Sequence, residues 1–182
     1  MRSKLFVPGA RPELFAKALA GDADALSLDL EDSVAPERKA EARAAVAEFV
    51  ASDAMRASAK VVIVRVNAPG SLEFEDDLAA VACAGVDLLN LPKIESADAL
   101  LAAAMLVERA EAANGVDRPI GLLVNIETPK ALANAAAIAS AHHSFSAEFD
   151  DKQPVKIDGT VVKFEFMNPH SWIHIDAPGA DG

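Results

Sequence analysis

The chain has 182 residues, of which 52% are hydrophobic and 25% charged, a composition typical of a globular protein with a substantial core. Its net charge of −11 makes nucleic acid and anionic membrane surfaces poor partners. No apolar run reaches the roughly 18 residues that a membrane-spanning helix needs, and Met1–Gly9 lacks the apolar core of a signal peptide. The single cysteine, Cys83, excludes an intramolecular disulfide, so we expect a cytoplasmic protein.

Five short apolar runs alternate with helical patterns over residues 1–141. The runs are almost continuously apolar, which is typical of parallel strands covered on both faces. Proline, serine and threonine mark helix starts and glycine marks helix ends, at Pro12, Gly21, Pro36, Ser96, Gly115 and Thr128. The predicted strands are Leu5–Pro8, Ala25–Leu30, Val61–Asn67, Val86–Pro92 and Ile120–Ile126. This order predicts an α/β fold of right-handed βαβ units, in an open sheet or a barrel, with Cys83 in an alanine-rich helical stretch.

The pattern changes after Ala141. Apolar residues alternate with polar ones as in exposed strands, and Asp158-Gly159 predicts a hairpin turn. We therefore expect two units of different origin, residues 1–141 and a short β-rich appendage at residues 142–182. All four histidines lie in the appendage, and a metal site there is one alternative: His142, His143, His170 and His174.

In parallel βα folds, functional residues gather at the carboxyl ends of the strands. Asp29 and Glu31 are two residues apart, so they share a strand face, and burying them is costly unless they meet a cation or hydrogen-bond donors. For Glu31 and Asp32, an exposed loop is an equal alternative to function. Arg65 interrupts an apolar strand and must pair with an anion, either a substrate carboxylate or a structural partner such as Asp29 or Glu31.

Two further charged residues follow strands. Glu127 ends the fifth predicted strand directly before a helix, where it is either favoured by the helix dipole or a ligand for a hard cation. Lys93 follows the fourth strand and could form a Schiff base or bind an anion, although a surface lysine is the commoner case.

Five segments, in order along residues 1–141, together resemble the HpcH/HpaI aldolase and citrate lyase β-subunit family. They are Arg2–Gly9, Asp29–Pro36, Arg65–Asn67, Leu91–Ser96 and Ile126–Thr128. The resemblance implies a partial TIM barrel, namely the first five βα units, in a protein that is commonly a homo-oligomer. It also implies a lyase that cleaves or forms carbon–carbon bonds in acyl-CoA esters or keto acids with Mg²⁺.

The same resemblance implies roles for individual residues. Glu127 corresponds to one of two carboxylate ligands of magnesium, and Arg65 to the residue that grips the carboxylate of a keto acid. Glu31 and Asp32 would lie near the reacting centre. Two basic residues resemble positions that bind the CoA phosphates, Arg11 and Lys39.

The chain also departs from the family pattern. A complete member has three more strands, of which the sixth supplies the second magnesium carboxylate, and a late catalytic acid; neither has a match here. Residues 142–182 instead resemble a small exported bacterial β-protein family of unknown function, and Ala139-Ser140-Ala141 has the form of a signal cleavage site. We therefore expect a chimera with weak or no lyase activity. The alternatives are a non-catalytic half-barrel that assembles with another chain, and an exported metal-binding protein governed by the appendage.

Overall fold

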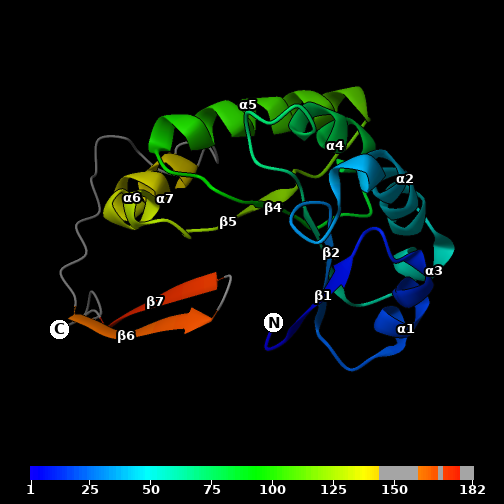
Figure 1. The fold of residues 1–182 in the computed structure, drawn as a ribbon, viewed down its shortest axis with the longest axis horizontal. Helices are drawn as coiled ribbons and strands as arrows, with labels where there is room; N and C mark the ends of the chain where they lie inside the picture. The colour runs from blue at the N-terminus through cyan, green and yellow to red at the C-terminus, as the bar shows by residue number, and fades with distance from the viewer. Residues whose placement is uncertain (144–159, 168–169, 177–182) are drawn as a thin grey trace.

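The computed structural model describes residues 1–143, 160–167 and 170–176, and Figure 1 shows their arrangement. All five predicted strands are confirmed and form one parallel sheet whose spatial order follows the chain. They are β1 (Lys4–Pro8), β2 (Ala25–Asp29), β3 (Val61–Arg65), β4 (Leu88–Leu91) and β5 (Gly121–Val124). A strand order without reversal is that of successive units around a barrel, whereas doubly wound sheets reverse direction.

Helices follow each strand, largely where the sequence predicts them. The helical segments are η1 (Pro12–Leu14), α1 (Phe15–Ala20), η2 (Pro36–Arg38), α2 (Lys39–Val50), α3 (Asp53–Arg56), α4 (Phe74–Val81), α5 (Ala97–Ala113), α6 (Pro129–Ala133) and α7 (Ala135–His143). The Ser96 hydroxyl caps α5 by accepting from Ala99 N at 3.2 Å, as predicted. Cys83 lies just beyond α4 rather than inside a helix, because the backbone leaves the helical conformation at Ala82. Within the described part of the chain, no helix is long and apolar enough to cross a membrane.

The helices cover one face of the curved sheet (Figure 1). Alternate strand residues such as Leu28, Val64 and Leu89 are fully buried there against Val46 and Leu100 of the helices. The other residues of each strand lie on the opposite face, here named the inward face. Across it the strand pairing aligns Phe6 with Ser27, and Asp29 with Arg65, Asn90 and Leu123 in turn.

The appendage forms a separate antiparallel pair, β6 (Thr160–Met167) and β7 (His170–Asp176), which agrees with the β-rich prediction. The predicted turn at Asp158-Gly159 lies outside the described residues. The four histidines belong to the part of the chain whose side chains the structure does not describe, so the alternative of a histidine metal site stays a prediction.

Candidate functional site at the carboxyl ends of the strands

A buried ion pair joins the ends of β2 and β3. Arg65 donates from Nε to Asp29 Oδ1 at 2.7 Å and from Nη2 to Asp29 Oδ2 at 2.8 Å. The two residues are register partners, and only 2% of Asp29 and 5% of Arg65 is exposed. Burial raises the pKa of Asp29, but the hydrogen bonds from Arg65 outweigh burial and hold this pKa below its usual value. The structure thus shows Arg65 in the structural ion pair that was one of its two predicted alternatives.

The third guanidinium nitrogen of Arg65 faces Glu31. Nη1 lies 3.2 Å from Glu31 Oε2, and the other oxygen, Oε1, lies 2.7 Å from Lys93 Nζ. Both distances are those of ion pairs, but the contacts lack hydrogen-bond geometry. Arg65 Nη1 and both carboxylate oxygens are also buried, and none of the three has a hydrogen-bond partner. Burial raises the pKa of Glu31 more than the two cations lower it. Glu31 is therefore suited to carry a proton, and Nη1 is suited to receive another acceptor.

Of the two acids after β2, the structure buries Glu31 and leaves Asp32 exposed. Glu31 is only 4% exposed, so the exposed-loop alternative is wrong for Glu31. The Asp32 side chain is 61% exposed and lies 3.8 Å from Arg65 Nη1 and 3.5 Å from Lys93 Nζ. Glu31 thus belongs to the buried cluster, and Asp32 lies at its solvent side.

Lys93 connects this cluster to the end of β5. Its φ of +56° is the single positive value among the described non-glycine residues, and its backbone N–H donates to Glu127 Oε1 at 2.7 Å. The ion pair with Glu31 raises the pKa of the Lys93 ammonium. One residue thus holds acids from two strand ends, although the side chain is half exposed like that of an ordinary surface lysine.

Glu127 is half-buried at the carboxyl end of β5. Its Oε1 accepts from Lys93, and its Oε2 has only a weak contact, 3.5 Å from Asn125 Nδ2. Among the residues that the structure describes, no group of three or more histidine, cysteine or acidic residues could hold a metal ion. Because Mg²⁺ commonly takes one or two protein carboxylates and completes its shell with water and substrate oxygens, Glu127 fits as a single ligand.

The two predicted CoA contacts lie in different surroundings. Lys39 Nζ is half-buried and donates to Leu30 O at 2.7 Å, Glu31 O at 2.5 Å and Asn67 Oδ1 at 2.7 Å. These three bonds use all of its ammonium protons and hold the chain after β2 in place. Arg11 is exposed after β1, where it forms an ion pair with Glu13.

A second buried network, which the sequence analysis did not find, supports the end of β3. Asp77 of α4 is 1% exposed and accepts from the Asn67 backbone N at 2.8 Å and its side-chain Nδ2 at 2.7 Å. Arg43 of α2 donates from Nε to the same carboxylate at 2.9 Å. In the sequence Asp77 is one acid in a run with Glu75 and Asp76, and no local signal distinguishes it. The network ties two helices to the strand end that carries Arg65.

The chain matches the family described as HpcH/HpaI aldolase/citrate lyase over residues 2–158. It is 38% identical over 143 residues to an L-malyl-CoA/beta-methylmalyl-CoA lyase of Cereibacter sphaeroides, covering 77% of this chain and 44% of that protein. It is 40% identical over 141 residues to the citrate lyase subunit beta of Escherichia coli K12, covering 77% and 46%. The chain thus spans about half the length of these curated relatives.

Solved structures of similar proteins also match this chain over about half of their own length. The citrate lyase beta subunit of Mycobacterium tuberculosis, complexed with oxaloacetate and magnesium, matches with a TM-score of 0.58 at 36% identity and covers 76% of this chain and 52% of that chain. The CitE protein of the same organism, in complex with magnesium, acetoacetate and coenzyme A, matches equally well and covers 44% of that chain. The five βα units described here therefore correspond to part of a TIM barrel.

Proposed function

Because the chain belongs to the HpcH/HpaI aldolase/citrate lyase family, we propose that it carries the substrate-binding part of a magnesium-dependent carbon–carbon lyase for acyl-CoA esters or keto acids. The observation that carries this proposal is Arg65, whose buried Nη1 has no hydrogen-bond partner at the functional end of the sheet. The relatives from Mycobacterium tuberculosis bind oxaloacetate or acetoacetate with magnesium, and one of them binds coenzyme A, which supports the same ligand classes here.

The residues at the strand ends would have different roles in substrate binding and in the reaction. Asp29 holds Arg65 through Nε and Nη2, so that Nη1 meets the carboxylate of the keto acid. Glu31, whose pKa burial raises, lies beside Nη1 and exchanges a proton with the reacting carbon or oxygen, while Asp32 borders the same place. Magnesium at Glu127 would polarise the keto oxygen and stabilise the enolate-like charge of cleavage.

CoA binding is proposed at Arg11 and Lys39. Arg11 is free to turn toward a phosphate by leaving its exposed partner Glu13, because surface pairs contribute little stability. Lys39 would have to exchange one of its three internal acceptors for a phosphate oxygen. The cytoplasmic location, the homo-oligomeric state and the junction after Ala141 also stay predictions.

We further propose that this chain alone has weak or no lyase activity, since the resemblance assigns to this chain only one of the two magnesium carboxylates, Glu127. Calorimetric titration of the 182-residue chain with oxaloacetate tests the site, with and without Mg²⁺. We expect magnesium-dependent binding that is at least tenfold weaker in Arg65→Lys and Glu127→Ala, a difference of about 1.4 kcal/mol. Glu48→Ala, at an exposed position of α2, is the matched control.

Two results would contradict different parts of the proposal. If wild-type chain binds neither oxaloacetate nor a malyl-type CoA ester at saturating Mg²⁺, the substrate site is wrong. If it cleaves malyl-CoA or citramalyl-CoA rapidly and Glu127→Ala abolishes the cleavage, the site is right and the expectation of weak activity is wrong.

A further inference from the structure

Lys93 lies in a backbone conformation that a lysine rarely adopts. Its φ is +56°, and the other two positive φ angles of the described residues are those of Gly70 and Gly115. The left-handed region is strained for a residue with a Cβ, whereas glycine enters it freely. Both chain neighbours of Lys93, Pro92 and Ile94, are buried, so the surrounding structure holds its backbone in place. Residues fixed in strained conformations concentrate at functional sites.

Lys93 contacts two acids through different parts of the residue. Its backbone N–H donates to Glu127 Oε1 at 2.7 Å, and its side-chain Nζ lies 2.7 Å from Glu31 Oε1. The strand that precedes Lys93, β4, is the neighbour of β5, whereas β2 lies two strands away. The backbone of Lys93 therefore serves the adjacent strand end, while its side chain reaches past the end of β3 to the acid after β2.

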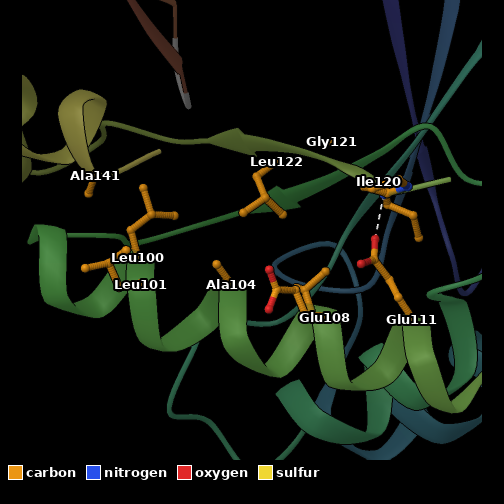
Figure 2. A pocket seen from close by; sticks show the side chains of 11 residues that line it. Leu100, Leu101, Ala104, Glu108, Glu111, Ile120, Gly121, Leu122 and Ala141 are labelled. Atoms are coloured by element: carbon orange, nitrogen blue, oxygen red, sulfur yellow. Dashed lines mark hydrogen bonds between the residues drawn. The ribbon is translucent and has the colours of Figure 1, made fainter. Parts of the chain in front are cut away.

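A second bond between a backbone N–H and a glutamate provides a comparison. Glu111 of α5 accepts from the backbone N of Ile120 at 2.6 Å, beside a cavity between α5 and β5 that mainly apolar side chains line (Figure 2). Ile120 is buried, its side chain is apolar and its φ is not positive. This contact ties α5 to the start of β5 without a strained backbone or a charged donor residue. The contact of Lys93 with Glu127 has both.

We propose that Lys93 is a positioning residue that sets the separation and orientation of Glu127 and Glu31. The inference rests on the proposed function, which gives one of these acids to Mg²⁺ and the other to proton exchange. The backbone bond occupies Glu127 Oε1, which leaves Oε2, with only a 3.5 Å contact to Asn125, for a cation. The ammonium holds Glu31 Oε1, while the other oxygen, Oε2, lies 3.2 Å from Arg65 Nη1.

Each contact of Lys93 has its own expected effect. Hydrogen bonds to a metal-binding carboxylate orient it, and their loss commonly weakens metal binding by about 10- to 100-fold. Loss of the backbone bond should therefore weaken Mg²⁺ binding at Glu127. Without the ammonium, Glu31 would turn toward Arg65 and occupy Nη1 itself, so a substrate carboxylate would bind less tightly.

A surface lysine that only stabilises its loop is the competing interpretation. In its favour, the side chain is 51% exposed and its ammonium also lies 3.5 Å from the exposed Asp32. A lysine of that kind would affect the free energy of unfolding, and its loss would not separate Mg²⁺ binding from keto-acid binding. Glycine would also suit the left-handed backbone better than lysine does.

Three replacements of Lys93 separate its two contacts. Lys93→Gly removes the ammonium and keeps a residue that tolerates positive φ, and Lys93→Arg keeps a cation. Lys93→Val removes the ammonium and, being β-branched, also disfavours the backbone conformation that directs the N–H to Glu127. The control is Lys130→Ala, which removes another exposed lysine at this end of the sheet, one that pairs with Glu95 at 3.1 Å.

Calorimetry of the 182-residue chain measures the binding of Mg²⁺ alone and of oxaloacetate at saturating Mg²⁺. We expect Lys93→Gly to bind Mg²⁺ like the wild type but oxaloacetate about tenfold more weakly, and Lys93→Arg to recover most of the oxaloacetate affinity. Lys93→Val should lose about tenfold in both affinities, and Lys130→Ala should match the wild type. Urea unfolding checks that each variant is folded; if Lys93→Val is not, Lys93→Gly and Lys93→Arg decide.

The outcomes separate this inference from the proposed function. If the wild type binds neither Mg²⁺ nor oxaloacetate, the proposed function fails and the inference fails with it. If the wild type binds both, and Lys93→Gly binds oxaloacetate as tightly as the wild type, the inference alone is overturned. Equal losses of affinity in Lys93→Gly and Lys93→Arg that parallel a loss of stability would also overturn it, because Lys93 would then only stabilise its loop.

Discussion

Replacing Arg65 with methionine leaves the Asp29 carboxylate buried without its cation. The substitution removes two hydrogen bonds, of 2.7 and 2.8 Å, between side chains that are only 6% and 3% exposed. Removing one partner of a buried ion pair costs about 3–5 kcal/mol, because the remaining charge is uncompensated. Since a domain of this kind has a total stability of roughly 5–15 kcal/mol, Arg65→Met should be folded but much closer to unfolding.

A double-mutant cycle separates the pair from its surroundings. Asp29 also accepts from the backbone N–H of Glu31 at 2.9 Å and of Ser33 at 3.1 Å, so the second substitution must keep an acceptor. Asp29→Asn removes the charge and keeps an acceptor oxygen. The double variant should therefore be more stable than Arg65→Met alone, with a coupling energy of about 2 kcal/mol in urea unfolding followed by circular dichroism.

The stability of the variants in this cycle should also depend on pH in a defined direction. In the wild type the pKa of Asp29 is lowered, because Arg65 outweighs burial, so the pair stabilises the fold above the unfolded pKa, near 3.9, and this contribution is lost as the pH falls further. In Arg65→Met only the hydrogen bonds from Ser33 and Glu31 still oppose burial, so the pKa of Asp29 rises above its wild-type value and acidification protonates the carboxylate more readily in the folded state. The defect should thus be largest near pH 7 and shrink toward pH 4. Additive effects of the two substitutions, or a loss independent of pH, would refute this account.

Three further substitutions test other contacts, each by urea unfolding. Gly9→Ala should destabilise by about 1–3 kcal/mol, because a Cβ would lie 2.7 Å from Asp29 O, whereas Gly21→Ala, with its nearest atom at 3.4 Å, should be tolerated; equal effects would contradict the packing. Lys39→Met removes three hydrogen bonds and leaves Asn67 Oδ1 without its donor, so it should cost about 1–3 kcal/mol, against little for the exposed Lys17→Met. Because burial raises the pKa of Glu31, the wild type should lose stability as the pH rises through and above 4.5, and Glu31→Gln should remove this slope; an unchanged slope would assign it to another group.

The strands and most of the helix starts follow from the sequence because their causes are local. The run Val61–Val64 is apolar on both faces, which is typical of a strand covered on both sides, and Ser96 begins α5 by capping a backbone N–H three residues away. The family segments are local too, since each lies at or near one strand. The limit of such reasoning shows at Cys83, which lies just past α4 in an alanine-rich stretch where composition favours a helix but the chain leaves it.

The partners of the charged residues were decided only by the tertiary structure. From the sequence alone, Arg65 could pair with either Asp29 or Glu31. The register that aligns β2 with β3 places it opposite Asp29. The backbone bond from Lys93 to Glu127 forms because the ends of β4 and β5 are adjacent in the sheet. No local sequence pattern predicts this bond or the positive φ of Lys93. The physical reason is that residue type and spacing determine which groups cannot be buried alone, whereas register and packing determine which distant group satisfies them.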